Sequence, residues 1–409
     1  MKKLFFFIIL YVCSAWQTLE AQEIGNSYIY LEFREFDVRA KAVVAVSDLE
    51  FAYGKPIDSN ITSYIAAHIR VKGEDGITWL VKVEKPLVRP SYISGTIHLN
   101  MIFSPAIGFS TRRFVLNSTL VNDKVLSHRT YVIVNSDWDN GISNYNPEGI
   151  GILYSSSNEL NIYREPQNLG KGFVGIFNVG AIHIRKGFDH ILFMLMLVLA
   201  TPLLFTATRR DKLIEIKKRS FHLFKLAAIF ASGHAIALLF ACVGWIKLPV
   251  WAVEIFIAIV IIVSAIHVFW PILANKEWSL SLGFGVLHGL AFSNIVLDYG
   301  LSAGRLVVGV IGLNLGILGM QLLVMLSLAP WFFIAAESSY YNIMKYSFAT
   351  AGMTIAAFWI REIVSGLPSS IIIVFNSMID RPVGVIAFMA VISLLVRYSP
   401  GQPKEIHKN

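Results

Sequence analysis

The chain divides into two parts that differ in the spacing of their apolar residues. Between residues 22 and 170, apolar and polar residues alternate in short runs such as ITWLVKVEK, GTIHLNMIF, RRFVLNSTLV and RTYVIVNS, and turn-forming clusters such as DSN, GEDG and NYNPEG separate them. Alternation with a period of two predicts β-strands that bury one face. From residue 188 to 398, nearly continuous apolar segments follow one another. We therefore expect an extracytoplasmic, all-β sandwich-like domain over 22–170 and an all-α membrane domain over 171–398.

The strand pattern predicts seven or eight strands and one irregularity. In the run YLEFREFDVRAKAVVAV, the apolar residues up to Phe33 share one phase and those from Phe36 onward share the other. A β-bulge at Arg34 and Glu35 would shift the phase in this way, because it adds one residue to one strand of a pair.

The apolar segments predict a membrane bundle of about seven transmembrane helices. The fifth segment is long enough to tilt or break. The expected spans are 188–207, 223–244, 250–271, 279–297, 304–334, 346–365 and 382–398.

The segment that precedes the first span has a pattern of its own. GFVGIFNVGAIHI, residues 172–184, predicts a re-entrant or interfacial helix that carries His183 toward the membrane. Gly187 would allow the chain to break just before Asp189, because glycine tolerates backbone conformations that interrupt a helix.

The ends of the chain and its basic loops predict an orientation. Residues 1–21 begin with Lys2 and Lys3 and continue into an apolar stretch too short to span a bilayer, which is typical of a signal peptide. The loop 208–222 carries six Lys or Arg residues against two acids, so the positive-inside rule places it in the cytoplasm. An odd number of spans then gives a cytoplasmic tail over 399–409. We expect a multi-pass protein of the bacterial inner membrane.

The composition narrows the functional classes. The chain is 55% hydrophobic and 15% charged, whereas soluble domains are roughly 25% charged. The net charge of +8 is typical of basic cytoplasmic loops in a membrane protein, so we expect the lipid bilayer, and no nucleic acid, as a partner. The two cysteines, Cys13 and Cys242, lie in separate apolar segments, which predicts no disulfide framework.

The β-rich domain offers little chemistry. Its isolated strand histidines, His98 and His128, are interpreted as packed or exposed side chains, and SDWDNG (residues 136–141) as a tight turn. The domain could bind a periplasmic partner or ligand, which its sequence does not identify.

Ionisable and amide side chains interrupt the apolar segments. A charged residue at the centre of a membrane helix costs roughly 2.5–3.5 kcal/mol on insertion scales, so such residues mark functional sites. The residues are Asp189 and His190 in the first expected span, His234 in the second, Glu254 and His267 in the third, His288 in the fourth, and Asn314 and Gln321 on one face of the fifth.

Imidazole and carboxylate groups are ligands that Ni²⁺, Co²⁺ and Zn²⁺ accept. We expect Asp189, His190, His234 and His288 to converge on one ion path, with His183 at its extracytoplasmic mouth. On a straight helix, His183 and His190 would lie about 10 Å apart, which predicts two successive ion positions. The metal ion would be a substrate, and no tightly bound cofactor is expected. The alternative is that each residue makes an interhelical hydrogen bond.

Four stretches, in this order, resemble the HupE/UreJ family, in its variant with an exported β-rich domain: HIRKGFDHILFMLMLVL, ASGHAIALLFACVGWIKLPVWAVEIFIA, FGVLHGLAFSN and GLNLGILGMQL. The resemblance implies a nickel or cobalt permease. The chain departs from the family pattern at Leu318, where an acidic residue is frequent. The matching positions are His183, Asp189, His190, His234, Glu254, His288, Asn314 and Gln321.

Two other functions stay open. An intramembrane metal-dependent hydrolase could use the same residues to hold zinc and activate water, although no HExxH or GxSxG motif is present. A membrane-anchored interaction or sensory protein would use the helices only as an anchor.

The orientation can be tested with a reporter that is active only outside the cytoplasm. Fused after residue 170, the reporter should be active, and fused at Lys217 it should be silent, because the basic loop stays inside. The reverse pattern would contradict both the signal peptide and the orientation.

Overall fold

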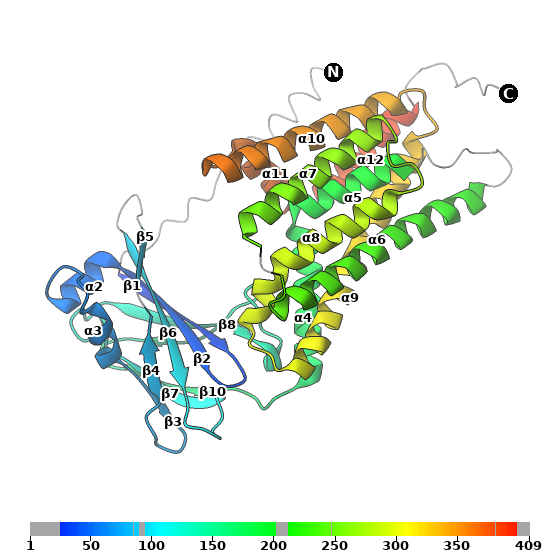
Figure 1. The fold of residues 1–409 in the computed structure, drawn as a ribbon. Helices are drawn as coiled ribbons and strands as arrows, with labels where there is room; N and C mark the ends of the chain where they lie inside the picture. Colours follow the sequence, from blue (N-terminus) through cyan, green and yellow to red (C-terminus); the bar gives the residue numbers. More distant parts are fainter. Residues whose placement is uncertain are drawn as a thin grey trace. The chain divides into compact units, whose positions relative to one another are not determined.

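The structure is a computed structural model that describes residues 25–84, 86–89, 95–201, 212–246, 248–380 and 382–398. The expected signal peptide and cytoplasmic tail lie outside the described residues. The chain divides into two compact units (Figure 1). The first, called the β unit, contains the described residues up to Ile176 together with Ile295–Gly309; the second, called the helical unit, contains the described residues of Phe177–Asn294 and those from Val310 onward. The domain boundary expected at residue 170 stays a prediction.

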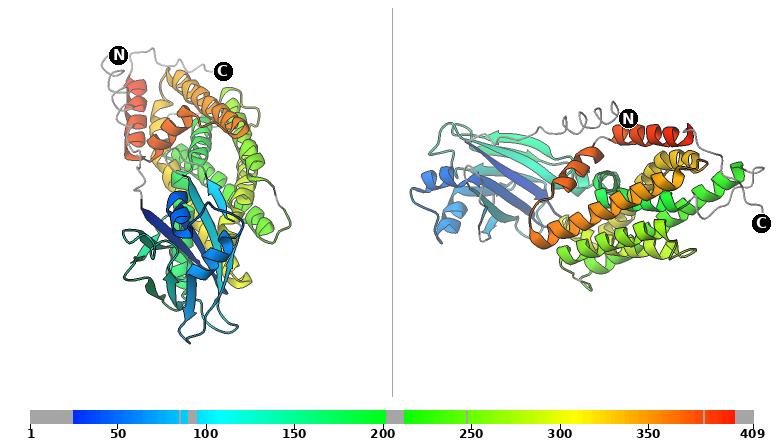
Figure 2. Two further views of the ribbon diagram at one scale, coloured as in Figure 1. Left: turned by 90° about the vertical axis from the view of Figure 1, so that its left-hand side faces the viewer. Right: turned by 90° about the horizontal axis from the view of Figure 1, so that it is seen from above.

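The described strands of the β unit form two sheets (Figures 1 and 2). The larger has the order β4-β6-β2-β1-β8-β9, with β5 paired to β6, and the smaller has the order β10-β7-β3. The strands are β1 (Asn26–Phe33), β2 (Val38–Ala45), β3 (Ile69–Gly73), β4 (Leu80–Val83), β5 (Leu87–Arg89), β6 (Thr96–Ser104), β7 (Arg113–Ser118), β8 (Arg129–Asp137), β9 (Glu148–Leu153) and β10 (Glu159–Tyr163).

Alternating residues of both sheets meet in one apolar core. Leu31 of β1, Leu99 of β6 and Leu116 of β7 are all fully buried in it. This is the packing that strands with one apolar face require, and it accounts for the alternation in the sequence.

Two details of the β unit differ from the expectation. The phase change after Phe33 is a hairpin turn and not a bulge: the Arg34 N–H donates to the Asp37 carbonyl, and β1 and β2 pair antiparallel on either side. The unit is also not all-β, because two short helices follow β2, α2 (Val46–Tyr53) and α3 (Ile61–His68). Helix α2 buries Leu49 and Ala52, which are three residues apart, and this spacing suits a helix face.

A buried ion network ends strand β8. Arg112 donates to both carboxylate oxygens of Asp137, at 2.8 and 3.1 Å, and Arg164 donates to Oδ2 at 2.9 Å. Burial alone would raise the pKa of Asp137, but these guanidinium groups and the Asn140 amide hold it below its usual value. The network fixes the chain where β8 leaves the sheet.

His128 is packed, as expected, but it is fully buried and has polar partners. Its Nε2 lies 2.7 Å from the Ser27 hydroxyl and its Nδ1 lies 3.2 Å from Asp48 Oδ2. Burial lowers the pKa of His128, and the Asp48 carboxylate offsets this only in part. His128 is therefore neutral in the folded β unit at neutral pH.

This burial predicts that the β unit loses stability in mild acid. Below about pH 6.5, the unfolded chain binds a proton at residue 128 that the folded chain does not. This difference lowers the free energy of unfolding by at most about 1.4 kcal/mol per pH unit. Pulse proteolysis of the full chain in urea should show the unfolding midpoint falling between pH 7 and 5, and His128→Gln should reduce this slope. His98→Gln is the matched control and should keep it. Equal slopes in wild type and His128→Gln would contradict the assignment.

The helical unit contains long helices that run roughly side by side (Figures 1 and 2). In the part of the chain that the structure describes, four helices are long and apolar enough to cross a membrane: α6, α7, α8 and α9. The helices after β10 are α4 (Leu169–Lys186), α5 (Phe188–Ala200), α6 (Lys212–Cys242), α7 (Val250–Phe269), α8 (Glu277–Asp298), α9 (Ala303–Ala335), α10 (Tyr341–Ser365), α11 (Ser370–Ile379) and α12 (Pro382–Tyr398).

The remaining three expected spans correspond to shorter or more polar helices. The helices α5 and α12 are apolar but short, and α10 carries Lys345, Arg361 and Glu362. The expected extension of the first span from residue 202 to 207 lies outside the described residues. The long fifth segment is one helix, α9, with Pro330 inside it.

Helix α7 matches a bilayer in length and in its ends. Its 20 residues correspond to about 30 Å, the thickness of the hydrocarbon core. Trp251 and Trp270 stand near its two ends and are 60% and 67% exposed. Exposed tryptophans at both ends of an apolar helix are typical of the two membrane interfaces.

Candidate metal centre

The candidate site forms where the chain breaks between α4 and α5. Gly187 separates the two helices with an extended backbone, φ −76° and ψ 105°. A Cβ built at Gly187 would lie 2.6 Å from His190 Nδ1 and 2.9 Å from both Asp189 Oδ1 and the His183 carbonyl. Only glycine leaves room for these groups, and the break expected before Asp189 is confirmed.

Helix α4 packs backbone to backbone against α9. A Cβ on Gly180 would lie 2.2 Å from the Leu313 carbonyl oxygen, and one on Gly316 would lie 2.0 Å from the Phe177 carbonyl oxygen. The second half of α4 therefore lies against α9, consistent with a re-entrant segment that leads to the break.

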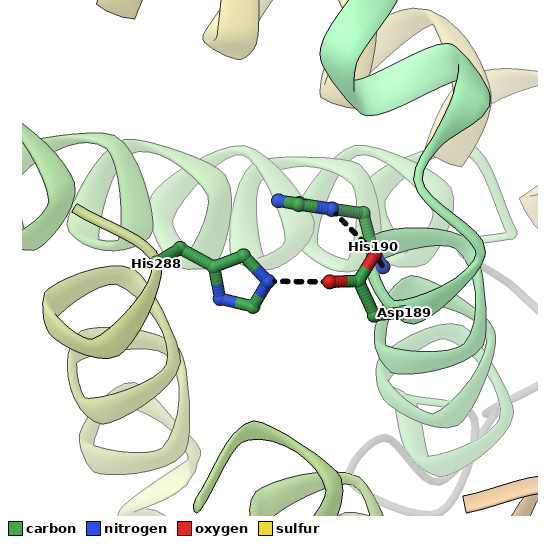
Figure 3. A group of neighbouring side chains, drawn as sticks. All are labelled: Asp189, His190 and His288. Atoms are coloured by element: carbon green, nitrogen blue, oxygen red, sulfur yellow. Dashed lines mark hydrogen bonds and ion pairs between the residues drawn. The ribbon is translucent and has the colours of Figure 1, made fainter. Parts of the chain in front are cut away.

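The break brings one carboxylate between two imidazoles (Figure 3). Asp189 Oδ1 lies 2.9 Å from His190 Nδ1, and Asp189 Oδ2 lies 2.8 Å from His288 Nε2. The backbone N–H of His190 also donates to Oδ1, at 2.9 Å. Asp189 stands in the first turn of α5, where the positive end of the helix dipole favours a negative charge.

The arrangement of these three residues could hold a metal ion. One donor atom from each of Asp189, His190 and His288 lies within 4.8 Å of the other two. Donors around a tetrahedral ion with 2.0–2.1 Å bonds lie roughly 3.3 Å apart, so small side-chain rotations would close the site around an ion. His288 stands near the middle of α8, between Glu277 and Asp298.

The hydrogen bonds of His234 and His190 engage Nδ1 of each ring and so leave a lone pair on Nε2, where a metal ion could bind. His234 Nδ1 lies 3.0 Å from Asn314 Oδ1, and the Asn314 amide donates to the Val310 carbonyl, which fixes the amide orientation. A neutral imidazole whose Nδ1–H donates must carry its lone pair on Nε2. The same holds for His190, whose Nδ1 faces Asp189. The Nε2 atoms of His183, His190 and His234 are buried and have no hydrogen-bond partner among the described residues.

The side chain of His183 lies closer to that of His190 than a straight helix predicts. Its ring centroid lies 4.7 Å from that of His190, whereas the sequence predicted about 10 Å along one helix axis. The expected separation of about 10 Å between these two side chains is therefore wrong, because the extended backbone at Gly187 interrupts the helix between them. The two successive ion positions stay a prediction. His190 and His288 are also adjacent, with ring centroids 4.2 Å apart.

Close helix packing brings His234 and His288 onto facing helices. A Cβ on Gly285 would lie 2.2 Å from the Phe230 carbonyl oxygen, and one on Gly289 would lie 2.3 Å from the His234 carbonyl oxygen. The helices α6 and α8 therefore touch through their backbones at this glycine pair, as small residues in membrane helices permit.

Phenylalanines that the sequence analysis did not single out surround the imidazoles. Phe284 lies 4.2 Å from His288 between ring centroids, Phe292 lies 4.4 Å from His183, and Phe230 lies 5.8 Å from His190. A sequence pattern could have identified two of them: FxxxH occurs at 230–234 and again at 284–288, so each of these phenylalanines lies one helical turn before a histidine.

Two expected site residues stand apart from this group. No hydrogen bond joins Glu254 on α7 to the other site residues in the part of the chain that the structure describes. Gln321 is buried on α9, and its Oε1 has no hydrogen-bond partner among the described residues. Hydrogen bonds and ring contacts thus join His183, Asp189, His190, His234, His288 and Asn314, and none among the described residues joins Glu254 or Gln321 to them.

The comparisons with known proteins agree with this arrangement. A family model described as HupE / UreJ protein matches residues 159–363, half of the chain, which include every residue of the site. A search of the curated proteins found no match. With the helix break, the imidazole group and this match together, the chain belongs to the HupE/UreJ family.

Proposed function

We propose that the protein is a permease or facilitator that carries a divalent transition-metal ion, nickel or cobalt in the first place and zinc as the third candidate, across the bacterial inner membrane. The observation that carries the proposal is the set of three buried Nε2 atoms that have no hydrogen-bond partner among the described residues, beside the Asp189–His190–His288 group. A buried polar atom without a partner is costly, and a cation that accepts imidazole lone pairs would satisfy all three. The association of the HupE/UreJ family with nickel and cobalt transport supports this.

Asp189 and His288 would exchange a proton for the metal ion. The Nδ1–H of His288 donates to the Phe284 carbonyl, 2.8 Å away, and its Nε2 faces the Asp189 carboxylate. Both neighbours accept hydrogen bonds, so His288 donates through Nδ1 to Phe284 and shares a proton with Asp189 through Nε2. A cation that enters takes the place of this proton, because a ligating imidazole nitrogen must offer its lone pair.

The broken helix favours transport over catalysis. Interrupted membrane helices expose backbone groups and side chains at a substrate-ion site inside the membrane, and transporters use this arrangement. The negative end of the α4 dipole and the Asp189 carboxylate both attract a cation at the break. A hydrolase would need the same residues together with room for water and a second substrate.

The β unit supports the proposed orientation. The Ser302 N–H, in the connection between α8 and α9, donates to Glu35 Oε2 at 3.1 Å. With loop 208–222 in the cytoplasm, the α8–α9 connection lies on the extracytoplasmic side, where the exported β unit would also lie. The C-terminus would then be cytoplasmic.

His190→Ala and His288→Ala should abolish metal uptake, because each removes a ligand from the site. The measurement is initial uptake of Ni²⁺ and Co²⁺ into proteoliposomes, together with the amount of folded protein recovered from the membrane. His222→Ala on α6 is the control and should transport normally. If both site variants transport at the wild-type rate, the cluster only holds the helices together.

Asn314→Leu should weaken apparent affinity by roughly 10- to 100-fold, because it frees the His234 ring that Asn314 now orients. The concentration dependence of uptake measures this effect. Asn314→Asp keeps the acceptor oxygen and should lose less. Equal losses in both variants would mean that the residue acts through its volume and not through its hydrogen bond.

Metal content separates this proposal from its alternatives. Tight, stoichiometric zinc in the purified protein without uptake would favour the hydrolase. Neither bound metal nor uptake, for Ni, Co, Zn, Cu and Fe alike, would favour an anchored interaction protein.

A further inference from the structure

Trp138 is buried, but not by the apolar core of the β sandwich. The residue begins a short 3-10 helix (Trp138–Asn140) directly after β8 and is 3% exposed. It does not belong to the apolar core between the two sheets, and its Nε1 has no hydrogen-bond partner among the described residues. Its neighbours instead come from the ends of three helices.

Glycines let two of these helices touch the indole ring. A Cβ on Gly172 of α4 would lie 2.3 Å from Trp138 Nε1 and 2.4 Å from Cε2. A Cβ on Gly309 of α9 would lie 3.4 Å from the far edge of the ring. Tyr299, directly after α8, meets the indole edge to face, with ring centroids 6.2 Å apart.

The turn that carries Trp138 is braced on both sides. Gly141, which ends the turn, lies against α4: a Cβ on Gly175 would lie 2.5 Å from its Cα. Asp139 Oδ2 lies 3.5 Å from Arg305 in the first turn of α9 and 3.9 Å from Arg112, which in turn holds Asp137. The indole is therefore presented by a rigid turn and not by a mobile loop.

Two helices, α4 and α9, contact Trp138, and a third, α8, ends directly before Tyr299. All three also carry residues of the candidate metal centre. On α4, His183 follows Gly172 by eleven residues, and His288 precedes Tyr299 by eleven. Eleven residues are three helical turns, on the order of 16 Å, and bring the side chain back to the same face. Asn314, which orients His234, follows Gly309 by five residues on α9.

We propose that Trp138 is a positioning residue of the metal centre: it spaces the extracytoplasmic ends of α4, α8 and α9 and so sets the separation of His183, His288 and the Asn314–His234 pair. This inference rests on the proposed transport function.

The most specific test adds one methyl group to α4 beside the indole ring. Gly172→Ala pushes against the indole ring, whereas Gly170→Ala, two residues earlier on the same helix, meets only Asn168 Oδ1 at 3.3 Å. Alanine is the better helix former, so a loss of transport in Gly172→Ala does not come from a weaker helix. Nickel and cobalt uptake into proteoliposomes should show an apparent KM raised roughly 2- to 30-fold in Gly172→Ala, with a smaller change in maximal rate and a wild-type KM in Gly170→Ala.

A second substitution that restores the KM distinguishes a positioning role of Trp138 from damage to the fold. Trp138→Phe removes the ring atoms that the new methyl group would strike, so the double variant Gly172→Ala, Trp138→Phe should return the KM toward the wild-type value. Trp79→Phe, a change to a buried tryptophan that packs on Phe114 inside the β sandwich, should not rescue Gly172→Ala. Should Gly172→Ala yield no folded protein, Arg305→Gln, which removes the brace to Asp139, takes its place with the same expected rise in KM.

The outcomes distinguish this inference from the proposed function. A wild-type KM in Gly172→Ala, or rescue by Trp79→Phe as well, overturns the role of Trp138 and leaves transport standing. Wild-type protein that moves no metal removes the proposed function and, with it, this inference.

Discussion

The bridge from Asp189 to two imidazoles is the interaction on which the candidate metal centre depends. One carboxylate holds His190 through Oδ1 and His288 through Oδ2, and so ties the start of α5 to the middle of α8. Gly187 leaves room for the bridge, because a Cβ at this position would lie 2.6 Å from His190 Nδ1 and 2.9 Å from Asp189 Oδ1. With its Nδ1 held by Asp189, His190 keeps its lone pair on Nε2, facing the interior of the group.

Sequence reasoning predicted the types of element well and their junctions less well. The period-two runs identified most of the strands, because a sandwich buries every second residue. The hairpin at Arg34–Asp37 was misread as a bulge, because a turn and a bulge both shift the phase and only pairing partners distinguish them. The apolar segments identified the long helices, but hydropathy alone could not show that α4 packs into the bundle beside α9, since α4 is amphipathic and rich in glycine.

The site was predictable in its residue types but not in its arrangement. Costly polar residues in apolar segments pointed to His190, His234 and His288, and the structure brings them together. The tautomer of His234 followed only from its hydrogen bond to Asn314, 80 positions away, and the Asp189–His288 contact joins residues 99 positions apart. The role of Trp138 was also hidden, because SDWDNG reads as a tight turn and its neighbours Gly172, Tyr299 and Gly309 are distant in sequence.

The phenyl rings around the imidazoles bear on how ions shed water. Mg²⁺ and Ca²⁺ bind oxygen ligands and Mg²⁺ gives up its hydration shell reluctantly. Among the described residues, the hydrogen bonds to these imidazoles come from one carboxylate, that of Asp189. Phe230, Phe284 and Phe292 offer no replacement for the lost water. A hard cation would therefore lose hydration free energy without gaining equivalent ligand bonds. A softer ion would offset the same loss by binding the imidazole nitrogens. Selectivity against abundant magnesium would then arise from hydration chemistry and would need no narrow filter.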